Sequence, residues 1–383
     1  MSTNAITVEL RLTGLVVLDA AEHADRIEVA AEYGNEEATC PRCGRSTWQV
    51  HARRKQRKRD AELWGKPVWV SIWKRRFRCR ACHQVFTEDD PVCGRRRRTT
   101  LRLREQTARE AQEASVRAVS RWHNVSEGLV QRSWVEAYGA VAPPSKQHVL
   151  LGVDGFCVRR PGVMWTGLWD LESRAPVAVM KGERRVDIQR LLERHADRKT
   201  VKAVAMDLAE ANRQAVQMVL PEAKIVADKF HVVALVHRAL QEVRGGRRLP
   251  GNTAWLMHRN VEHLSQADAD RLAAELGENP ALKTAWLLKE GLRGVYRCGT
   301  KEKAEPELEA WIGEARRSSL TPFQRAAKTL KKWSTEILNY WDYPITNAMV
   351  EGKHNRVKVL KRRAYGYRND QTFSLRILNL FHT

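Results

Sequence analysis

Two Cys-x-x-Cys pairs constrain the fold of this 383-residue chain more than any other feature. Cys40 and Cys43 have the Cys-Pro-x-Cys-Gly form of a metal-binding knuckle, and Cys79 and Cys82 form the second pair. The 35 residues between the pairs exceed the usual spacing of a zinc ribbon, but strands within them can bring the knuckles together. Four thiolates suit tetrahedral zinc and leave no open position. We therefore expect a structural Zn²⁺, the alternative being four free buried cysteines.

Positive charge is concentrated in two segments of the chain. Residues 40–110 hold 21 basic and 7 acidic residues, and residues 351–383 hold 8 and 2, within a formal net charge of +22. Ordinary surfaces mix both signs, so these segments predict a nucleic-acid partner. The candidate phosphate contacts in them are Arg53, Arg54, Arg57, Arg95, Arg96, Arg97, Arg98, Lys358, Lys361, Arg362 and Arg363.

Composition and periodicity divide the chain into three regions. Residues 1–98 form an N-terminal region with the zinc ribbon. Strands are predicted in it at 5–18 and 27–31, and apolar alternation predicts a third at 67–79. Residues 99–140 are helical, and the segment VAPPSKQ after them is interpreted as a linker. The third region covers residues 148–383. No apolar run long enough for a membrane helix and no secretory signal are found, so we expect a cytoplasmic protein without a membrane partner.

The third region alternates buried strands with amphipathic helices, which favours a mixed α/β sheet. The predicted strands cover residues 148–156, 163–171, 175–182, 202–207 and 223–230. The predicted helices between them cover residues 186–198 and 209–220. From about 232 to 338 the pattern is helical throughout, which predicts an all-helical insertion before a last helix that begins near Asn347.

A helix-turn-helix is predicted within residues 99–140. Residues 115–122 and the helix after Ser126 resemble the two helices of a DNA reader, with Ser126 as the N-cap of the second. Arg132, Ser133 and Glu136 are expected to project from its exposed face, and Arg132 is a further candidate DNA contact. An ordinary helical hairpin is the alternative, but the neighbouring zinc module favours DNA binding.

Three acidic residues have the positions that a divalent-metal site requires. Asp154 and Asp207 each end a predicted buried strand, and Glu351 lies near the start of the last helix. Their carboxylates are hard oxygen ligands, which suit Mg²⁺ or Mn²⁺ at a catalytic site. The alternative for each one alone is a helix cap or a surface charge. Neither a Gly-x-Ser-x-Gly motif nor a phosphate loop offers competing chemistry.

Several segments resemble the ISL-three (ISL3) family of bacterial insertion-sequence transposases, of the DDE class, over nearly the whole chain. The N-terminal region resembles it through CPRCG, VHARRKQRKRD and RRFRCRACHQVFTE. The middle resembles it through LLGVDGF, VAMD and PEAKIVADKFHVV. The most specific segment is EGKHNRVKVLKRRAYGYRNDQTFSLRIL. Cys93 is the main departure, because it fits no ligand pattern.

The resemblance implies an RNase-H-like core with a helical insertion before Glu351. It also implies a transposase that binds the terminal inverted repeats of double-stranded DNA, cleaves DNA strands and transfers them to target DNA. Synapsis of two ends would require a homodimer or a larger assembly, and we expect a bacterial, nucleoid-associated protein. The alternative is a non-catalytic DNA-binding regulator that uses the zinc ribbon and helix-turn-helix alone.

Two aspartates compete for the place of the second catalytic carboxylate. An RNase-H-like sheet has its second acid on the strand after the first helix, and that order favours Asp207. Asp228 ends the next strand, with His231 three residues further on. We therefore expect Asp154, Asp207 and Glu351 to hold the metal ions, and Asp228 and His231 to be accessory residues that assist or orient DNA.

Overall fold

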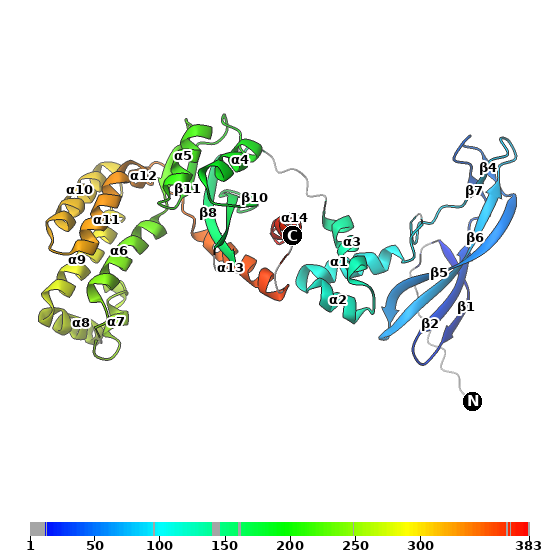
Figure 1. Cartoon of the computed structure of the whole chain (residues 1–383), viewed down its shortest axis with the longest axis horizontal. Coiled ribbons are helices and arrows are strands. Elements are labelled where there is room, and N and C mark those ends of the chain that lie inside the picture. Colours follow the sequence, from blue (N-terminus) through cyan, green and yellow to red (C-terminus); the bar gives the residue numbers. More distant parts are fainter. Residues whose placement is uncertain are drawn as a thin grey trace. The chain divides into compact units, whose positions relative to one another are not determined.

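The computed structural model describes residues 12, 14–94, 96–139, 146–159, 162–247, 249–364, 367 and 369–381. Contacts divide the chain into two compact units, Met1–Ala140 with Arg363–Tyr365 and Val141–Arg362 with Gly366–Thr383. We call these the N-terminal unit and the C-terminal unit, and each is described by itself (Figure 1). None of the helices in the described ranges is long and apolar enough to cross a membrane.

The N-terminal unit contains a five-stranded sheet in the order β1-β2-β6-β5, with β7 paired to β6. Its strands are β1 (Leu15–Glu22), β2 (Ile27–Tyr33), β5 (Val50–Leu63), β6 (Lys66–Arg78) and β7 (Val85–Thr87). Alternate residues of β2 and β6 are buried and form the core of this sheet, as the apolar alternation of residues 67–79 predicted for β6. β1 continues beyond the predicted end at Leu18, and most of the predicted strand 5–18 lies outside the described residues.

A long hairpin explains how the distant cysteine pairs meet. β5 and β6 are antiparallel and are joined by Trp64 and Gly65, which both have positive φ angles of 50° and 72°. Positive φ at both central residues is the geometry of a type I′ turn, whose twist matches that of the two strands. The hairpin then runs back to its open end, where Arg78 donates its backbone N–H to the carbonyl of Gln49 over 2.9 Å. Each cysteine pair flanks this open end.

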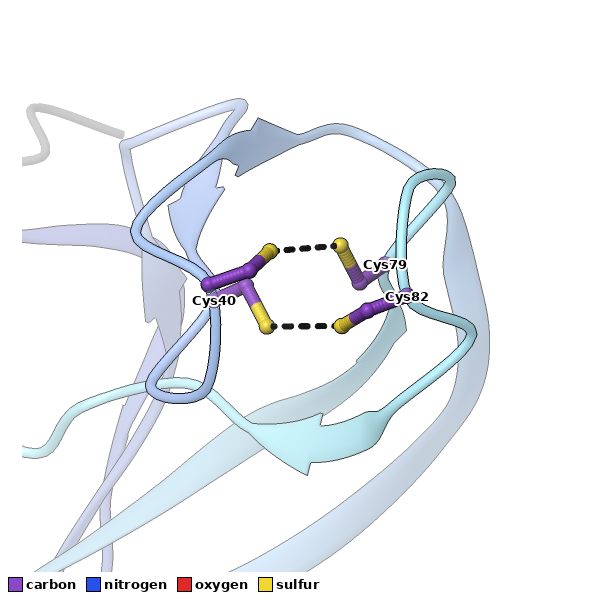
Figure 2. Close-up of side chains that lie close together, drawn as sticks. Cys40, Cys79 and Cys82 are labelled. Atoms are coloured by element: carbon purple, nitrogen blue, oxygen red, sulfur yellow. Dashed lines mark hydrogen bonds between the residues drawn. The ribbon is translucent and has the colours of Figure 1, made fainter.

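The four cysteine sulfurs converge at the open end of the hairpin (Figure 2). Sγ of Cys40 lies 3.6 Å from Sγ of Cys82, and Sγ of Cys43 lies 3.5 Å from Sγ of Cys79. Thiolates around one tetrahedral zinc would be separated by roughly 3.8 Å, given the usual Zn–S distance. Backbone N–H donors lower the pKa of the Cys79 thiol to about 6, which favours the thiolate form that binds metal. The alternative of four free buried cysteines does not explain why all four sulfurs lie within 4.8 Å of one another, and Cys43 is exposed.

Three helices follow the sheet in the N-terminal unit: α1 (Leu101–Glu113), α2 (Val116–Trp122) and α3 (Glu127–Tyr138). Ser126 caps α3 as predicted, because its side chain accepts a hydrogen bond from the backbone N–H of Leu129. Fully buried Asp60 of β5 accepts a hydrogen bond from the hydroxyl of Thr100, which joins the sheet to α1. The prediction for Ser133 is wrong: it is buried with Trp134 on the inner side of α3.

The C-terminal unit is built on a five-stranded sheet in the order β10-β9-β8-β11-β12. Its strands are β8 (Leu150–Arg159), β9 (Val163–Asp170), β10 (Pro176–Lys181), β11 (Ala203–Met206) and β12 (Lys224–Ala227). The first three form an antiparallel meander, whereas β11 runs parallel to both β8 and β12. This is the mixed sheet of an RNase-H-like fold, which confirms the predicted fold class.

Helices cover both faces of this sheet. The helices α4 (Arg185–His195) and α5 (Glu210–Val219) bury one face in a core that includes Val153 and Met206. The helices α13 (Ala348–Arg363) and α14 (Asp370–Asn379) bury part of the other face against Phe156. Because neighbouring residues of a strand point to opposite faces, Asp154 lies on the same side as Phe156 and α13.

The expected all-helical insertion is present between β12 and α13 and has a hydrophobic core of its own. Its elements are α6 (Lys229–Arg244), α7 (Thr253–Leu256), the 3₁₀ helix Val261–His263, α8 (Gln266–Glu278), α9 (Pro280–Val295), α10 (Lys301–Arg317), α11 (Thr321–Lys332) and α12 (Ser334–Leu338). The buried aromatics Trp311, Phe323 and Trp333 lie in that core, so the insertion is stabilised largely by its own packing.

The first prediction concerns zinc. Cys40→Ser or Cys82→Ser should remove bound zinc and unfold the knuckles, because metal binding supplies much of the folding free energy of so small a module. Native mass spectrometry gives the zinc content, and thermal unfolding gives the stability. Cys298→Ser, outside the cluster, is the control and should keep a full equivalent of zinc. A wild-type chain purified without tightly bound zinc would disprove the assignment.

The second prediction concerns close packing at β8. A Cβ atom at Gly152 would lie 2.7 Å from Oδ1 of Asn347 and 2.9 Å from Cδ2 of Leu171, whereas at Gly155 the nearest atom is 3.7 Å away. Gly152→Ala should therefore lower the free energy of unfolding by about 1–3 kcal/mol, the usual effect of overpacking. The control Gly155→Ala should change it much less. Equal denaturant midpoints for the two variants would contradict this packing.

Candidate functional site

Three aspartates lie side by side near the carboxyl ends of the parallel strands of the C-terminal sheet; we call this place the sheet edge. Val153 of β8 pairs with Met206 of β11, which pairs in turn with Ala227 of β12. The next residue along each strand is an aspartate: Asp154, Asp207 and Asp228. Residues at equivalent positions of parallel strands share a face, so the register places all three carboxylates on the same side of the sheet.

Glu351 faces the outer members of this row across a pocket of about 480 Å³. The pocket is lined by Asp154 of β8, by Asp228 and His231 at the start of α6, and by Glu351 of α13. Phe230 and Asn347 also contribute to its wall. The structure thus brings Asp154, Glu351 and the two residues expected to be accessory to one pocket.

Asp207 lies next to this pocket without lining it. Its Oδ1 accepts hydrogen bonds from the amide of Asn212 over 2.7 Å and from the backbone N–H of Ala209 over 3.2 Å. In the described part of the chain, the four cysteines are the one group of three or more potential ligands whose atoms all lie within 4.8 Å of each other. The carboxylates at the sheet edge are therefore neighbours in a more open arrangement.

Burial and mutual repulsion act on these carboxylates. Burial raises the pKa of Asp207, and the charge of Asp154 raises it further against the opposing effects of Asn212 and His231. Burial also raises the pKa of Asp228, again with a contribution from Asp154. A divalent cation would offset both effects, and carboxylate oxygens are the donors that Mg²⁺ and Mn²⁺ prefer. The residues present therefore fit the expected cation.

Two histidines contact the carboxylates. His231 Nδ1 lies 3.4 Å from Oδ2 of Asp228, in agreement with its expected place near that residue. His354 Nδ1 lies 3.2 Å from Oδ2 of Asp154, and its buried ring packs against Phe156 with a centroid distance of 4.5 Å. Sequence reasoning missed His354. Its spacing of three residues from Glu351, which puts both on one side of a helix, was the signal that could have found it.

The basic residues of α13 divide into two sets. Lys358 and Lys361 line the pocket together with Glu351, because positions 351, 354, 358 and 361 follow one face of the helix. Arg362 and Arg363 lie at the end of α13 and are not among the lining residues. Of the four basic candidate residues on α13, the structure thus brings Lys358 and Lys361 to the pocket that the carboxylates line.

A second pocket, of about 700 Å³, lies within the N-terminal unit between β5 and α3. Arg57 and Trp69 form its sheet side, and the turn before α3, from Asn124 to Ser126, forms its helix side together with Leu129. The basic residues Arg96, Arg97 and Arg98 also line it. Arg57 stacks over Trp69 at 4.3 Å and pairs with Glu28 at 2.9 Å, so part of its charge is already compensated.

Three further candidate DNA contacts of this unit that the structure describes are not among the residues lining the pocket. Arg53 and Arg54 are exposed on β5, where Arg53 lies 3.6 Å from Glu32. Arg132 lies on α3 and is exposed there, in agreement with the expected face of that helix. Arg95 lies outside the described residues.

Comparison with known proteins gives two matching family models. The model DDE_Tnp_ISL3, described as a transposase, matches residues 151–377. The model Zn_ribbon_ISL3, described as the zinc-finger of transposase IS204/IS1001/IS1096/IS1165, matches residues 36–82 and therefore includes all four cysteines of the cluster.

Individual transposases are also similar to this chain. The transposase for insertion sequence element IS1001 of Bordetella parapertussis is 29% identical over 362 residues, which is 89% of this chain and 88% of that protein. The transposase for IS1557 of Mycobacterium tuberculosis is 27% identical over 200 residues, or 44% and 45% of the two chains.

Among solved structures, the Drosophila P element transposase strand transfer complex is similar over 73% of this chain and 91% of that one, at 11% identity and a TM-score of 0.41. That likeness is too distant to support an inference. The transposase family model covers more than half of the chain, and the zinc-ribbon model covers the cysteine cluster. The protein therefore belongs to the ISL3 family of transposases, which act on DNA, and carries the zinc ribbon of that family.

Proposed function

We propose that this transposase binds the terminal inverted repeats of an insertion sequence, cleaves DNA strands at the ends and joins the new 3′-hydroxyls to target DNA. One observation carries the proposal. Asp154, Asp207 and Asp228 occupy equivalent positions on three adjacent parallel strands, and Glu351 faces the same edge. The alternative, a non-catalytic DNA-binding regulator, does not explain why four carboxylates gather at one sheet edge.

We assign Asp154, Asp207 and Glu351 as the residues that would hold Mg²⁺ or Mn²⁺. When bound, such ions activate a water or a 3′-hydroxyl and stabilise the leaving oxygen of a phosphodiester. The carboxylates supply the charge and the hard oxygen donors; Asp154 is buried, Asp207 is partly buried, and Glu351 is exposed at the pocket. Asp228 and His231 are assigned accessory roles beside them.

Basic residues and a histidine on α13 are assigned to position the DNA and the carboxylates. Lys358 and Lys361 share a face of α13 with Glu351, so they can neutralise the phosphates of DNA that enters the pocket. Arg362 and Arg363 extend this basic surface to the end of the helix. His354 contacts Oδ2 of Asp154 and is itself packed against Phe156, so it holds the orientation of that carboxylate.

The N-terminal unit is assigned to recognition of the terminal repeats. In the proposed division, the zinc-ribbon region spans residues 1–98, the helix-turn-helix spans 99–140 and the catalytic domain spans 148–383. The pocket between β5 and α3 combines arginines with Trp69, which suits phosphate and sugar contacts beside the helix pair. The proposed contacts are Arg53, Arg54, Arg57, Arg95, Arg96, Arg97, Arg98 and Arg132.

Transposition brings two ends of one element together, so the proposed active form is a homodimer or a larger assembly. Because the proposed substrate is chromosomal and element DNA, we place its action at the bacterial nucleoid in the cytoplasm. The decisive experiment is cleavage of labelled element ends by the full chain with Mg²⁺, with Mn²⁺ and without metal. End binding without metal-dependent cleavage in any of these conditions would favour the regulator instead.

The third prediction separates the two candidate second carboxylates. Asp207→Asn should abolish cleavage and leave end binding intact, because an amide oxygen ligates divalent ions poorly without disturbing the fold. Asp228→Asn should reduce cleavage but leave measurable activity. Gel-shift and cleavage assays run in parallel give both readouts. Full activity in Asp207→Asn with none in Asp228→Asn would reverse the assignment.

The fourth prediction concerns the salt dependence of DNA binding. Replacing Arg95, Arg96, Arg97 and Arg98 with Gln should flatten the log–log slope of affinity against salt by about 0.9 for each DNA phosphate that the variant no longer neutralises. Arg97 lies 3.5 Å from Glu136, so its share should be smaller. Arg316→Gln with Arg317→Gln, at the exposed end of α10, is the control and should keep the wild-type slope. An unchanged slope in the fourfold variant would mean that this run faces solvent.

A further inference from the structure

The chain returns from the helical insertion to the sheet through one buried asparagine. Asn347 is 2% exposed and stands immediately before α13, the helix that carries Glu351. Its backbone N–H donates to Oδ1 of Asp228 over 3.1 Å, and its Nδ2 donates to the carbonyl of Val153 over 3.0 Å. One residue therefore joins the start of α13 to both strands that flank β11.

Asp228 and Asn347 also mark the two ends of the insertion. Asp228 directly precedes α6, and Asn347 directly precedes α13, although they are 119 positions apart in the sequence. A second buried hydrogen bond joins Nδ2 of Asn339 to the carbonyl of Ile225 over 2.8 Å. The insertion is thus closed at its base by side-chain contacts to β12 and its end.

The position of Glu351 follows that of Asn347. The carbonyl of Asn347 accepts hydrogen bonds from the backbone N–H groups of Val350 and Glu351, over 2.8 and 3.1 Å, and so forms the first turn of α13. Oδ1 of Asn347 packs directly on Gly152, two residues before Asp154, where a Cβ atom would come within 2.7 Å. A displaced Asn347 would therefore move Glu351 away from Asp154.

The surroundings of Asp228 suit a hydrogen-bond acceptor. The residue is 1% exposed, Oδ1 accepts from Asn347, and Oδ2 lies 3.4 Å from Nδ1 of His231. An asparagine side chain offers an oxygen in the same place and can accept the same hydrogen bond. Ligation of a divalent ion, in contrast, depends on the charge of a carboxylate.

We propose that Asn347 and Asp228 form a positioning pair, which closes the base of the insertion and sets where Glu351 lies relative to Asp154. Both residues act through Glu351 in this assignment, and neither acts on the reacting atoms. The inference rests on the proposed function, because it concerns the geometry of the proposed carboxylate site.

The fifth prediction compares two substitutions of Asp228 in the full-length protein. Asp228→Asn keeps the acceptor and should retain cleavage of labelled ends within several-fold of wild type. Asp228→Ala removes the acceptor and should lower cleavage by about 10–100-fold, the usual effect of removing a partner that orients a metal ligand. Binding of the DNA ends should be the same in both variants. If Asp228→Asn is as inactive as Asp228→Ala while end binding persists, Asp228 is a metal ligand and the proposal is overturned.

Asn347→Ala tests the other half of the pair with a readout that does not depend on turnover. Mn²⁺ affinity, measured by titration calorimetry, should fall by about 10–100-fold because Glu351 is no longer held in place. Asn252→Ala removes the same side chain from the start of α7, far along the insertion, and should match wild type. Wild-type Mn²⁺ affinity in Asn347→Ala would overturn the proposal. If Asn347→Ala does not fold, the Asp228→Asn result alone decides.

Failure of this inference can be told apart from failure of the proposed function. If the wild-type protein cleaves ends with Mg²⁺ or Mn²⁺ and the variants behave otherwise than stated, only the positioning pair is wrong. If the wild-type protein cleaves nothing in any metal, the proposed function fails, and the positioning pair fails with it.

Discussion

The parallel pairing of β11 with both β8 and β12 determines where three aspartates lie. Asp154 lies within β8, and Asp207 and Asp228 follow the last residues of β11 and β12 at the same level. The sheet therefore cannot separate the carboxylates without losing its register. Burial and the charge of Asp154 both disfavour ionisation of Asp207 and Asp228. Hydrogen bonds from Asn212 and Asn347 offset part of this cost in the folded chain, and a divalent cation would offset more. The hydrogen bonds around the sheet edge thus reduce the repulsion between carboxylates that the strand register holds close together.

Helix α13, which carries the fourth carboxylate, Glu351, follows the helical insertion in the sequence. The insertion has its own apolar core, so its packing does not fix the position of α13. That position depends on contacts made where the chain comes back, at Asn347, and on the packing of Val357 and Leu360 against Phe156 and its neighbours. Glu351 and His354 then face the sheet edge because they share one side of α13.

Local pattern in the sequence predicted the strands of the C-terminal sheet, but it missed strand β5 and did not contain the register of the parallel strands. Apolar runs predicted the strand that carries Asp154 and the strand that precedes Asp207, although β8 continues past Asp154 to Arg159. The paired cysteines predicted the zinc cluster, and each of these signals is short-range. The parallel register, the contact of His354 with Asp154 and the bonds of Asn347 join residues far apart in the chain, so no local pattern contains them. Ser133 was misplaced because a small polar residue fits where α3 approaches its neighbours closely, whatever its polarity suggests.

The closed base of the insertion also has a thermodynamic consequence. Because Asp228 and Asn347 are hydrogen-bonded, everything between them is a loop whose ends already meet. The entropy of closing a loop grows only with the logarithm of its length, at about 0.6 kcal/mol for each doubling. Residues could therefore be added to or removed from the helical lobe at little cost to the sheet. The lobe is free to change size and surface over evolution while the carboxylate-bearing end of the sheet stays as it is.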